Sequence, residues 1–550
     1  MLRARLTGWA AALVFVASTG VAQEHQHAPA PGEKLGTVRF ATSCNAAAQP
    51  QFDRAVALLH SFQFGPATEA FRNTLQADLS CAIAYWGIAL SQWTNPFAAV
   101  TRSAQRLQLG LEAVEHGKKL GAKTERERAY LDAVSRLYAD FEKTDQRARV
   151  LAYEQAMSRV ASAYPDDREA AIFYALALAA AADPADKTYA KQLKAGAILE
   201  KLFAEQPDHP GLAHYIIHSY DFAPLAPKAI DAARRYSQIA PSAPHALHMP
   251  SHTFTRVGYW QDSIESNIAA GAAARREGQT AEELHTIDYR MYAYLQTAQD
   301  AAAERLLREL PEVASRFDPD ASPSGAAGAS AGFFALAAIP ARHALEHRAW
   351  AEAAKLQPRP SPFRYTEAIT YFVRGLGAAH TGDIATAQSA IAALEQIRNQ
   401  LTQGNEGYWA QQVEIQRRGV SAWTALAEGR TADALREMQT AADLEDGTEK
   451  NAVTPGPIAP ARELLGEMLL QVSEPAQALK QFEVTLKKEP NRFRATFDAA
   501  QAATLAADHE TAQRYYNQLL KICERADKPA RPELDEARKA VTVAQDAPRE

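Results

Sequence analysis

The sequence predicts an all-α fold in which helical hairpins stack into a right-handed superhelix, an α-solenoid. From about residue 50 onward, apolar residues recur with the helical period, and Gly, Asp or Pro interrupts them about every 12 to 16 residues. The alternation of apolar and polar residues that marks half-buried strands is almost absent. The pattern also recurs at about 34 residues, so each hairpin buries its apolar face only against its neighbours.

The composition is that of a globular protein, with 47% hydrophobic and 23% charged residues in 550. The formal net charge of −6 gives no basic surface, so we expect no nucleic-acid partner. Residues 1–22 are predicted to be a cleavable signal peptide, because Arg3 and Arg5 precede an apolar core from Trp9 to Ala17. No later stretch approaches the roughly 18 apolar residues of a membrane span. We therefore predict a periplasmic or secreted protein with no transmembrane segment.

The rest of the chain divides into three predicted parts. Residues 23–50 are polar and rich in Pro and Gly at their start, which predicts a flexible leader that runs into the first hairpin. Residues 51–525 are predicted to form the superhelix, with histidine-rich central repeats at 209–295. Residues 526–550 are predicted to form a C-terminal capping helix and tail.

The chain has three cysteines, Cys44, Cys81 and Cys523. In an oxidising compartment, Cys44 and Cys81 can form a disulfide that closes a loop around the first hairpin and limits the unfolded chain. The alternative is a pair of buried free thiols. Cys523 is expected to be buried on a C-terminal helix.

The repeating unit resembles the tetratricopeptide repeat, a helix–turn–helix with small residues where helices cross and aromatic residues between them. Near the C-terminus, three such residues recur 34 positions later: Gly466, Ala478 and Phe482 correspond to Ala500, Ala512 and Tyr516. Pro/Gly-rich inserts at 319–332 and 445–460 interrupt the repeats. Loops of this length are often functional, and the sequence leaves open whether they cover the concave groove of the superhelix.

Two histidine pairs occupy equivalent places in consecutive repeats. His214 and His218 form the stretch HYIIH, and His248 and His252 follow 34 residues later. Both pairs fall at the fifth and ninth positions of the repeat, which line the concave groove of tetratricopeptide proteins. We therefore expect both pairs to face the groove.

The helices that carry these pairs are predicted over about residues 211–220 and 245–257. Pro250 falls inside the second helix, where it would remove a hydrogen bond and bend the axis. If the helix proper begins near Met249, Pro250 lies in the tolerated first turn and PHAL forms a separate short turn.

Further polar residues fall on the same stripe of three adjacent repeats, which stack roughly 10 Å apart. The predicted metal ligands are His214, His218, His248, His252, His245 and His285. The predicted neighbours, as outer partners or ligand contacts, are Asp221, Asp288, Tyr292 and Arg256. Four other histidines are interpreted as ordinary polar surface residues: His60, His116, His380 and His509.

Histidines at i and i+4 on one helix face offer two imidazoles to one metal ion. A histidine or carboxylate from an adjacent helix then completes a site for zinc or copper. HYIIH has the spacing of a zincin helix, but Tyr215 stands where the general-base glutamate would be, which argues against such a metalloprotease. Asp221 and Asp288 can be ligands or can orient imidazole N–H groups.

Three functions fit this pattern. The favoured one is a groove that binds a divalent transition metal, or a ligand with the help of a metal. The second is an interaction scaffold in the cell envelope that holds a protein or peptide in the groove. The third is a metal-free periplasmic enzyme that uses His, Tyr and Arg. Whether the protein is an enzyme stays open.

The wider pattern resembles a group of secreted bacterial tetratricopeptide-repeat proteins over nearly the whole mature chain. The matching stretches are LLHSFQF, AYWGIALSQWTNPF, DHPGLAHYIIHSYD, APHALHMPSHTFTRVGYW and VTPGPIAPARELLG. The resemblance implies the fold and secretion but no activity or substrate. It also makes DHPG part of the same pattern, which implies that His209 stands at the entrance to the site.

Overall fold

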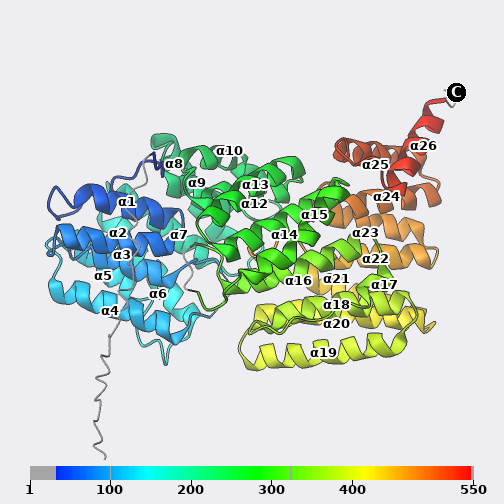
Figure 1. The fold of residues 1–550 in the computed structure, drawn as a ribbon, viewed down its shortest axis with the longest axis horizontal. Helices are drawn as coiled ribbons and strands as arrows, with labels where there is room; N and C mark the ends of the chain where they lie inside the picture. Colours follow the sequence, from blue (N-terminus) through cyan, green and yellow to red (C-terminus); the bar gives the residue numbers. More distant parts are fainter. Residues whose placement is uncertain (1–31, 99–100, 322–324, 547–550) are drawn as a thin grey trace, which may run out of the picture. The chain divides into compact units, whose positions relative to one another are not determined.

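The computed structural model describes residues 32–98, 101–321 and 325–546, and its compact helical unit begins at Lys34. Within these ranges the chain forms helices and no strands (Figure 1). None of the helices in the described part is both long and apolar enough to cross a membrane. The predicted signal peptide, residues 1–22, lies outside the described residues.

The helices follow one another along the chain with short connections. Their bounds are α1 Gln49–His60, α2 Phe64–Ala77, α3 Ala84–Trp93, α4 Ala104–Leu120, α5 Glu125–Ser135, α6 Gln146–Ala163, α7 Arg168–Ala180, α8 Ala190–Glu205, α9 Pro210–Ser219, η1 Ala226–Ala229, α10 Ile230–Ile239, α11 Pro244–His248, α12 Pro250–Arg256, α13 Trp260–Arg276, α14 Thr280–Gln296, α15 Asp300–Ser315, α16 Ala329–Glu346, α17 Trp350–Ala353, α18 Arg364–His380, α19 Ile384–Gln403, α20 Gly407–Ala427, α21 Thr431–Asp446, α22 Ala461–Gln471, α23 Pro475–Lys488, α24 Phe493–Leu505, α25 His509–Ile522 and α26 Pro532–Asp546.

Most helices pack against the helices next to them in the chain, as expected for stacked hairpins. The predicted period is visible in the helix starts: α9 and α11 begin at Pro210 and Pro244, and α23 and α25 begin at Pro475 and His509. Both intervals are 34 residues. The predicted fold class, an all-α superhelix of tetratricopeptide-type hairpins, is therefore confirmed.

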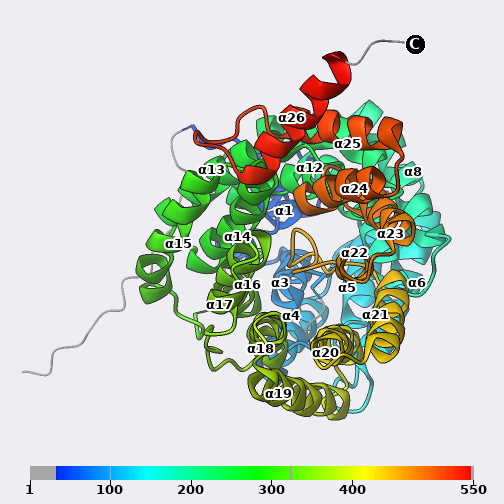
Figure 2. The ribbon, with the colours of Figure 1, turned by 90° about the vertical axis from the view of Figure 1, so that its right-hand side faces the viewer.

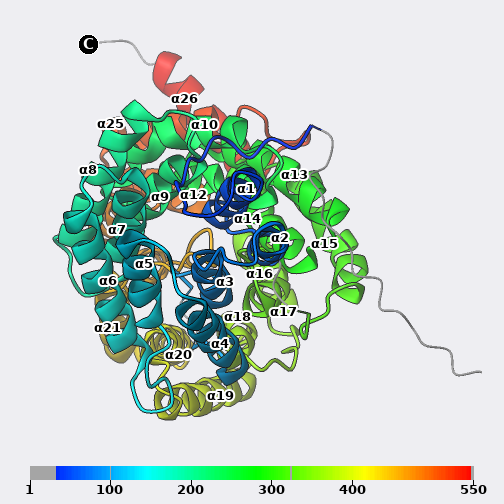
Figure 3. The same cartoon turned by 90° about the vertical axis from the view of Figure 1, so that its left-hand side faces the viewer.

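The segment between α21 and α22, residues 447–460, leaves this stacking and runs inside the superhelix. We call it the crossing segment. In the end-on views it passes through the space that the helices surround (Figure 2, Figure 3). Its inner position follows from hydrogen bonds to helices from earlier in the chain, such as Tyr289 to the carbonyl oxygen of Thr454 and Arg342 to that of Gly456.

Residues 23–50 were predicted as a flexible leader and the start of the first hairpin, and from Lys34 onward this part of the chain packs on the helices. The amide of Thr37 donates to the carbonyl of Asp208 at 2.9 Å, and that of Phe40 to the carboxylate of Asp53 at 3.0 Å. The Phe40 ring is buried against Phe52. An apolar ring in the polar leader thus fixes this part of the chain, because its burial favours docking.

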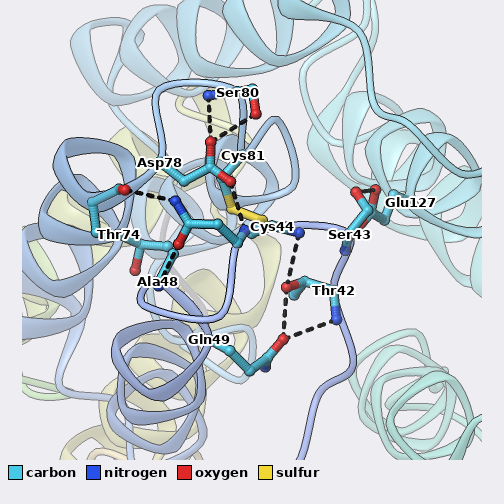
Figure 4. Close-up of a disulfide and its surroundings, with 12 residues drawn as sticks. Thr42, Ser43, Cys44, Ala48, Gln49, Thr74, Asp78, Ser80, Cys81 and Glu127 are labelled. Atoms are coloured by element: carbon cyan, nitrogen blue, oxygen red, sulfur yellow. Dashed lines mark hydrogen bonds between the residues drawn. A yellow bond between two sulfur atoms is a disulfide. The ribbon is translucent and has the colours of Figure 1, made fainter.

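A disulfide joins Cys44 in the leader to Cys81 in the turn before α3, with their Cα atoms 4.9 Å apart (Figure 4). Polar contacts hold both sides: Ser43 donates to Glu127 through its amide and its hydroxyl, both at 2.6 Å, and Asp78 accepts from the amide of Ser80. The bond ties the leader to the first repeats. Cys523, which follows α25, is a buried free thiol.

Candidate metal centre

Four helices carry the six histidines predicted as metal ligands. α9 and α11 each begin with a proline, which suits the first helical turn because the amide at that position has no partner within the helix. Pro250 begins α12, so PHAL belongs to the separate short helix α11, as the sequence allowed. α14 supplies the sixth histidine, His285.

The six histidines form two groups of three rather than one. The first triad is His214, His218 and His245, and the second triad is His248, His252 and His285. Within each triad, one potential ligand atom of each residue lies within 4.8 Å of the others. All six side chains are buried.

In the first triad, hydrogen bonds orient two of the rings through Nδ1. The Nδ1 of His214 donates to the carbonyl oxygen of His60 at 2.6 Å, and that of His245 to a carboxylate oxygen of Glu282 at 3.0 Å. Because these oxygens only accept, Nδ1 carries the proton and Nε2 keeps a lone pair. The Nε2 atoms of all three rings are buried and have no hydrogen-bond partner among the described residues.

The second triad is oriented in the same way. The Nδ1 of His248 donates to Oδ1 of Asn267 at 2.7 Å, and that of His252 to Asp221 at 3.0 Å. The two Nε2 atoms then face each other at 3.1 Å. Since both Nδ1 atoms carry protons, two lone pairs meet there. Nitrogen ligands of one tetrahedral zinc ion, at roughly 2.0–2.1 Å from the metal, lie about 3.3 Å apart.

Burial keeps several of these rings neutral. Together with the neighbouring histidines, it lowers the pKa of His214, His218 and His248 well below the ordinary value. Burial also lowers the pKa of His285, to about 3. Neutral imidazole is the form that binds a metal, so at pH 7 these four rings present lone pairs rather than charges.

Asp221 links the second triad to two cations. Its carboxylate accepts from Nε of Arg256 at 2.9 Å and lies 3.3 Å from Nζ of Lys450 in the crossing segment. Burial alone would raise the pKa of Asp221, but Lys450, Arg256 and the bond from His252 hold it well below the usual range. The structure thus places Asp221 and Arg256 beside the histidines.

Asp288 and Tyr292, also predicted as neighbours, contact other groups. Asp288 pairs with Arg342 of α16 at 2.8 Å, and the Tyr292 hydroxyl is bonded to Arg492 at 3.2 Å. Tyr292 stands almost two turns beyond His285 on α14, roughly 10 Å along the axis. Tyr289, one turn from His285, takes its place, with its hydroxyl 3.3 Å from Nε2 of His252.

His209 belongs to a third group, in which Glu169 bridges two histidines. Its Nε2 lies 2.9 Å from Glu169, and that of His60 lies 3.0 Å from the other carboxylate oxygen. A carboxylate accepts from both rings, so these nitrogens carry protons and offer no lone pair to a metal. The interpretation of His60 as a surface residue is therefore wrong: it is fully buried, because the superhelix brings α1 against α9.

The contact between α1 and α9 depends on Gly211. A methyl group at this position would lie 2.4 Å from Nδ1 of His60, closer than atoms can approach. Of the other histidines interpreted as surface residues, His116 and His509 are exposed, and His380 is half-buried against Trp350.

Aromatic rings enclose the first triad. The Phe62 ring lies 4.4 Å from the ring of His214 and 5.7 Å from those of His218 and His245, measured between centroids. Phe97 stacks on His218 at 4.2 Å. The insert before α16 also contributes, because the amide of Ala327 donates to Glu282 at 2.8 Å.

A cavity of about 170 Å³ borders the crossing segment. Arg256 and Lys450, the two cations that contact Asp221, are part of its lining. The rest of its wall combines aromatic, aliphatic and charged side chains, and Tyr365 and Trp409 are stacked there at 3.8 Å. Through Asp221, the two cations connect the wall of this cavity to His252 of the second triad.

The sequence reasoning missed several side chains that contact the triads: Phe62, Phe97, Asn267, Glu282, Tyr289 and Lys450. Two of them carry a signal in the sequence. Glu282 precedes His285 by three residues, and Tyr289 follows it by four, so all three share a helix face. Asn267 lies on the next helix, α13, and the other three come from distant parts of the chain.

No protein-family model matches the chain, and no curated protein sequence matches it. Solved structures give weak likenesses. The human IFIT1 dimer with m7Gppp-AAAA is 9% identical over 80% of this chain and 90% of its own, with a TM-score of 0.35. A monomeric IFIT1 mutant with Gppp-AAAA is 9% identical over 87% and 96%, with a TM-score of 0.36. Naa15/Naa10 bound to HypK-THB is 11% identical over 91% and 92%, with a TM-score of 0.23. At such TM-scores these likenesses carry no argument, and the fold class rests on the helices of this chain.

Proposed function

We propose that the histidine cluster inside the superhelix binds a divalent transition-metal ion, zinc or copper. The observation that carries this proposal is the set of Nε2 atoms of the first triad, His214, His218 and His245. These atoms are buried and have no hydrogen-bond partner among the described residues, and one ring nitrogen of each of the three histidines lies within 4.8 Å of the others. An unpartnered buried polar atom is costly, and a metal ion would satisfy all three at once.

The outer hydrogen bonds support the same function. In metal sites a coordinating histidine commonly donates its other N–H to a carboxylate or carbonyl, which fixes the tautomer and the ring orientation. Here Glu282 and the carbonyl of His60 accept from His245 and His214, and Asp221 accepts from His252. Three-imidazole donor sets suit zinc and copper better than magnesium or calcium, which prefer oxygen ligands.

The location remains part of the proposal. The predicted signal peptide directs the protein to the periplasm or the outside of the cell. The disulfide between Cys44 and Cys81 fits an oxidising compartment, since such bonds are rare in reducing ones.

The interior of the superhelix favours a metal over an extended peptide. An interaction scaffold would leave the concave surface open, whereas the crossing segment occupies it here with Lys450 buried beside Asp221. A protein partner would therefore bind on other surfaces or displace this segment.

Metal analysis of the mature chain, prepared without a histidine tag, tests the proposal. After loading with zinc or copper and gel filtration, we expect the protein to retain the ion and to melt at a higher temperature, because binding to the folded state stabilises it. The double substitution His218→Gln and His252→Gln should remove both effects, while the exposed-residue control His116→Gln should keep them. If the unaltered protein retains neither ion and its melting is unchanged, the proposal is wrong.

A further inference from the structure

The two triads are two copies of one construction, displaced by one repeat. In each, an i, i+4 histidine pair of one hairpin is completed by a histidine at the second position of the next repeat: His245 completes the first triad and His285 the second. We infer that each triad holds its own ion and that the protein carries a dinuclear zinc or copper centre. This inference rests on the proposed function.

The ligand sets of the two triads are independent. No histidine belongs to both, and each triad has its own anchors. The carbonyl of His60 and the carboxylate of Glu282 orient the first triad. Asn267 and Asp221 orient the second. Each set of three nitrogens is enough for one ion and leaves it one open tetrahedral position.

The assignment of Asn267 is fixed by its second bond. Its Nδ2 donates to the carbonyl of Ser263 at 2.8 Å, so Oδ1 is the atom that faces His248. The proton of His248 therefore sits on Nδ1, and its Nε2 points at Nε2 of His252. Two lone pairs at this distance repel unless a cation lies between them, which the second ion supplies.

The triads adjoin one another. The ring centroids of His245 and His248 are 5.9 Å apart, and those of His218 and His252 are 6.1 Å apart. These separations resemble those inside a triad, such as 4.8 Å between His214 and His218. Two bound ions would therefore be close neighbours.

The histidine pair bridged by Glu169 has a different composition and provides a matched internal control. Its two Nε2 atoms, on His60 and His209, already bond to the carboxylate. It resembles the triads in burial and histidine content but offers no convergent lone pairs. We therefore expect no third ion there.

Counting ions by native mass spectrometry separates this inference from the proposed function. The tag-free mature chain, with His25 and His27 of the leader replaced by alanine, is loaded with zinc. We expect two ions on this protein, one after His218→Gln, one after His285→Gln and none after both. His209→Gln, in the Glu169 group, should still hold two. If a variant fails to fold, as judged by circular dichroism, His214→Gln and His248→Gln replace His218→Gln and His285→Gln.

The outcomes point in different directions. If the protein without triad substitutions holds a single ion, and if either His218→Gln or His285→Gln abolishes its binding, the dinuclear centre is wrong and the proposed function stands. No ion on the unaltered protein would overturn both. Retention of two ions after the combined substitution would place them elsewhere and would also overturn both.

Copper loading tests whether the two ions are neighbours. Electron paramagnetic resonance of the protein with two Cu²⁺ ions should show a broadened or weakened signal, because nearby unpaired spins couple. Each single-triad variant, with one ion, should give the sharp spectrum of isolated copper. A two-ion spectrum that equals the sum of the two single-ion spectra would overturn the dinuclear centre.

Discussion

The two triads use the same repeat positions but lie in different surroundings. The first triad is enclosed by the rings of Phe62 and Phe97, and one carboxylate, Glu282, bonds to it. The second triad borders a charged layer, with Asp221 between its histidine and two cations. The comparison shows that the repeat determines where ligands stand, whereas segments from other parts of the chain determine their environment.

This difference has a chemical consequence for the open position of each ion. Phenyl rings offer no hydrogen bonds, so the first triad suits an ion that only holds the structure together. In the second triad, the Tyr289 hydroxyl lies 3.3 Å from Nε2 of His252, where it could bond to a water molecule or small anion on a bound metal. We expect exogenous ligands to bind at the second triad.

The largest expected difference between the triads concerns their carboxylates. Asp221→Ala leaves Arg256 and Lys450 buried without their shared partner, so we expect it to lower the free energy of unfolding by about 3–5 kcal/mol. The matched substitution Glu282→Ala strands no arginine or lysine and should cost about 1–3 kcal/mol. Urea denaturation of the metal-free proteins measures both. Equal losses would mean that the charged layer does not distinguish the triads.

Acidification is the second test, and we expect the metal-free protein to lose stability from about pH 6.5 downward. Burial lowers the pKa of His214, His218, His248, His252 and His285, to about 3 for His285, while unfolded histidine keeps a value near 6.5. Between these values the unfolded chain binds protons that the folded chain does not. Each such histidine therefore lowers the free energy of unfolding by up to about 1.4 kcal/mol per pH unit.

Paired substitutions turn this pH dependence into a comparison. Replacing His214 and His218 with Gln, or His248 and His285 with Gln, should flatten the slope of stability against pH equally, since each removes two histidines of lowered pKa. His116→Gln should leave the slope unchanged. Urea titrations at pH 5.0 and 7.5 give the slopes. If replacing His248 and His285 flattens the slope less than replacing His214 and His218, polar groups around the second triad take up protons in this pH range.

The third test weakens one triad more than the other. Glu282→Gln keeps the shape of the side chain but removes the negative charge that polarises His245. Loss of such an outer partner typically lowers metal affinity 10–100-fold. Zinc titration should therefore show one strongly weakened site and one site that changes less, because Glu282 acts on His285 through its charge without a hydrogen bond. Equal weakening of both sites would mean that the triads share their ions.

The smallest expected effect is that of Tyr289→Phe, which removes a hydroxyl beside the second triad only. This group makes long contacts, 3.3 Å to His252 and 3.3 Å to the carbonyl of Thr454. We expect a loss of about 0.5–1.5 kcal/mol in stability and no change in zinc content. Binding of azide to the copper-loaded protein, followed by visible absorption, should weaken as well. Unchanged azide binding would exclude Tyr289 from the open position.

The fold and the equivalent placement of the two histidine pairs could be predicted because both depend on a local period. The 34-residue register placed His214 with His248 and His218 with His252, and the tolerance of proline in a first helical turn explained Pro250. Such features need only neighbouring repeats, whose relative placement is the same along the chain.

The environment of the site could not be predicted because it depends on long-range contacts. His60 reaches the first triad through the return of α1 to α9, and Lys450 reaches the second through the crossing segment. The register also failed within α14, where the choice between Tyr289 and Tyr292 depends on distance along the axis as well as on the face of the helix.

The crossing segment is synthesised long after the histidines of the two triads. All six triad histidines precede residue 286, whereas Lys450 and Thr454, which contact Asp221 and Tyr289 beside the second triad, are made much later. A growing chain thus contains its histidines before it contains this segment. If the second triad holds an ion as proposed, docking of residues 447–460 would slow its release, although this segment contributes none of the six imidazoles.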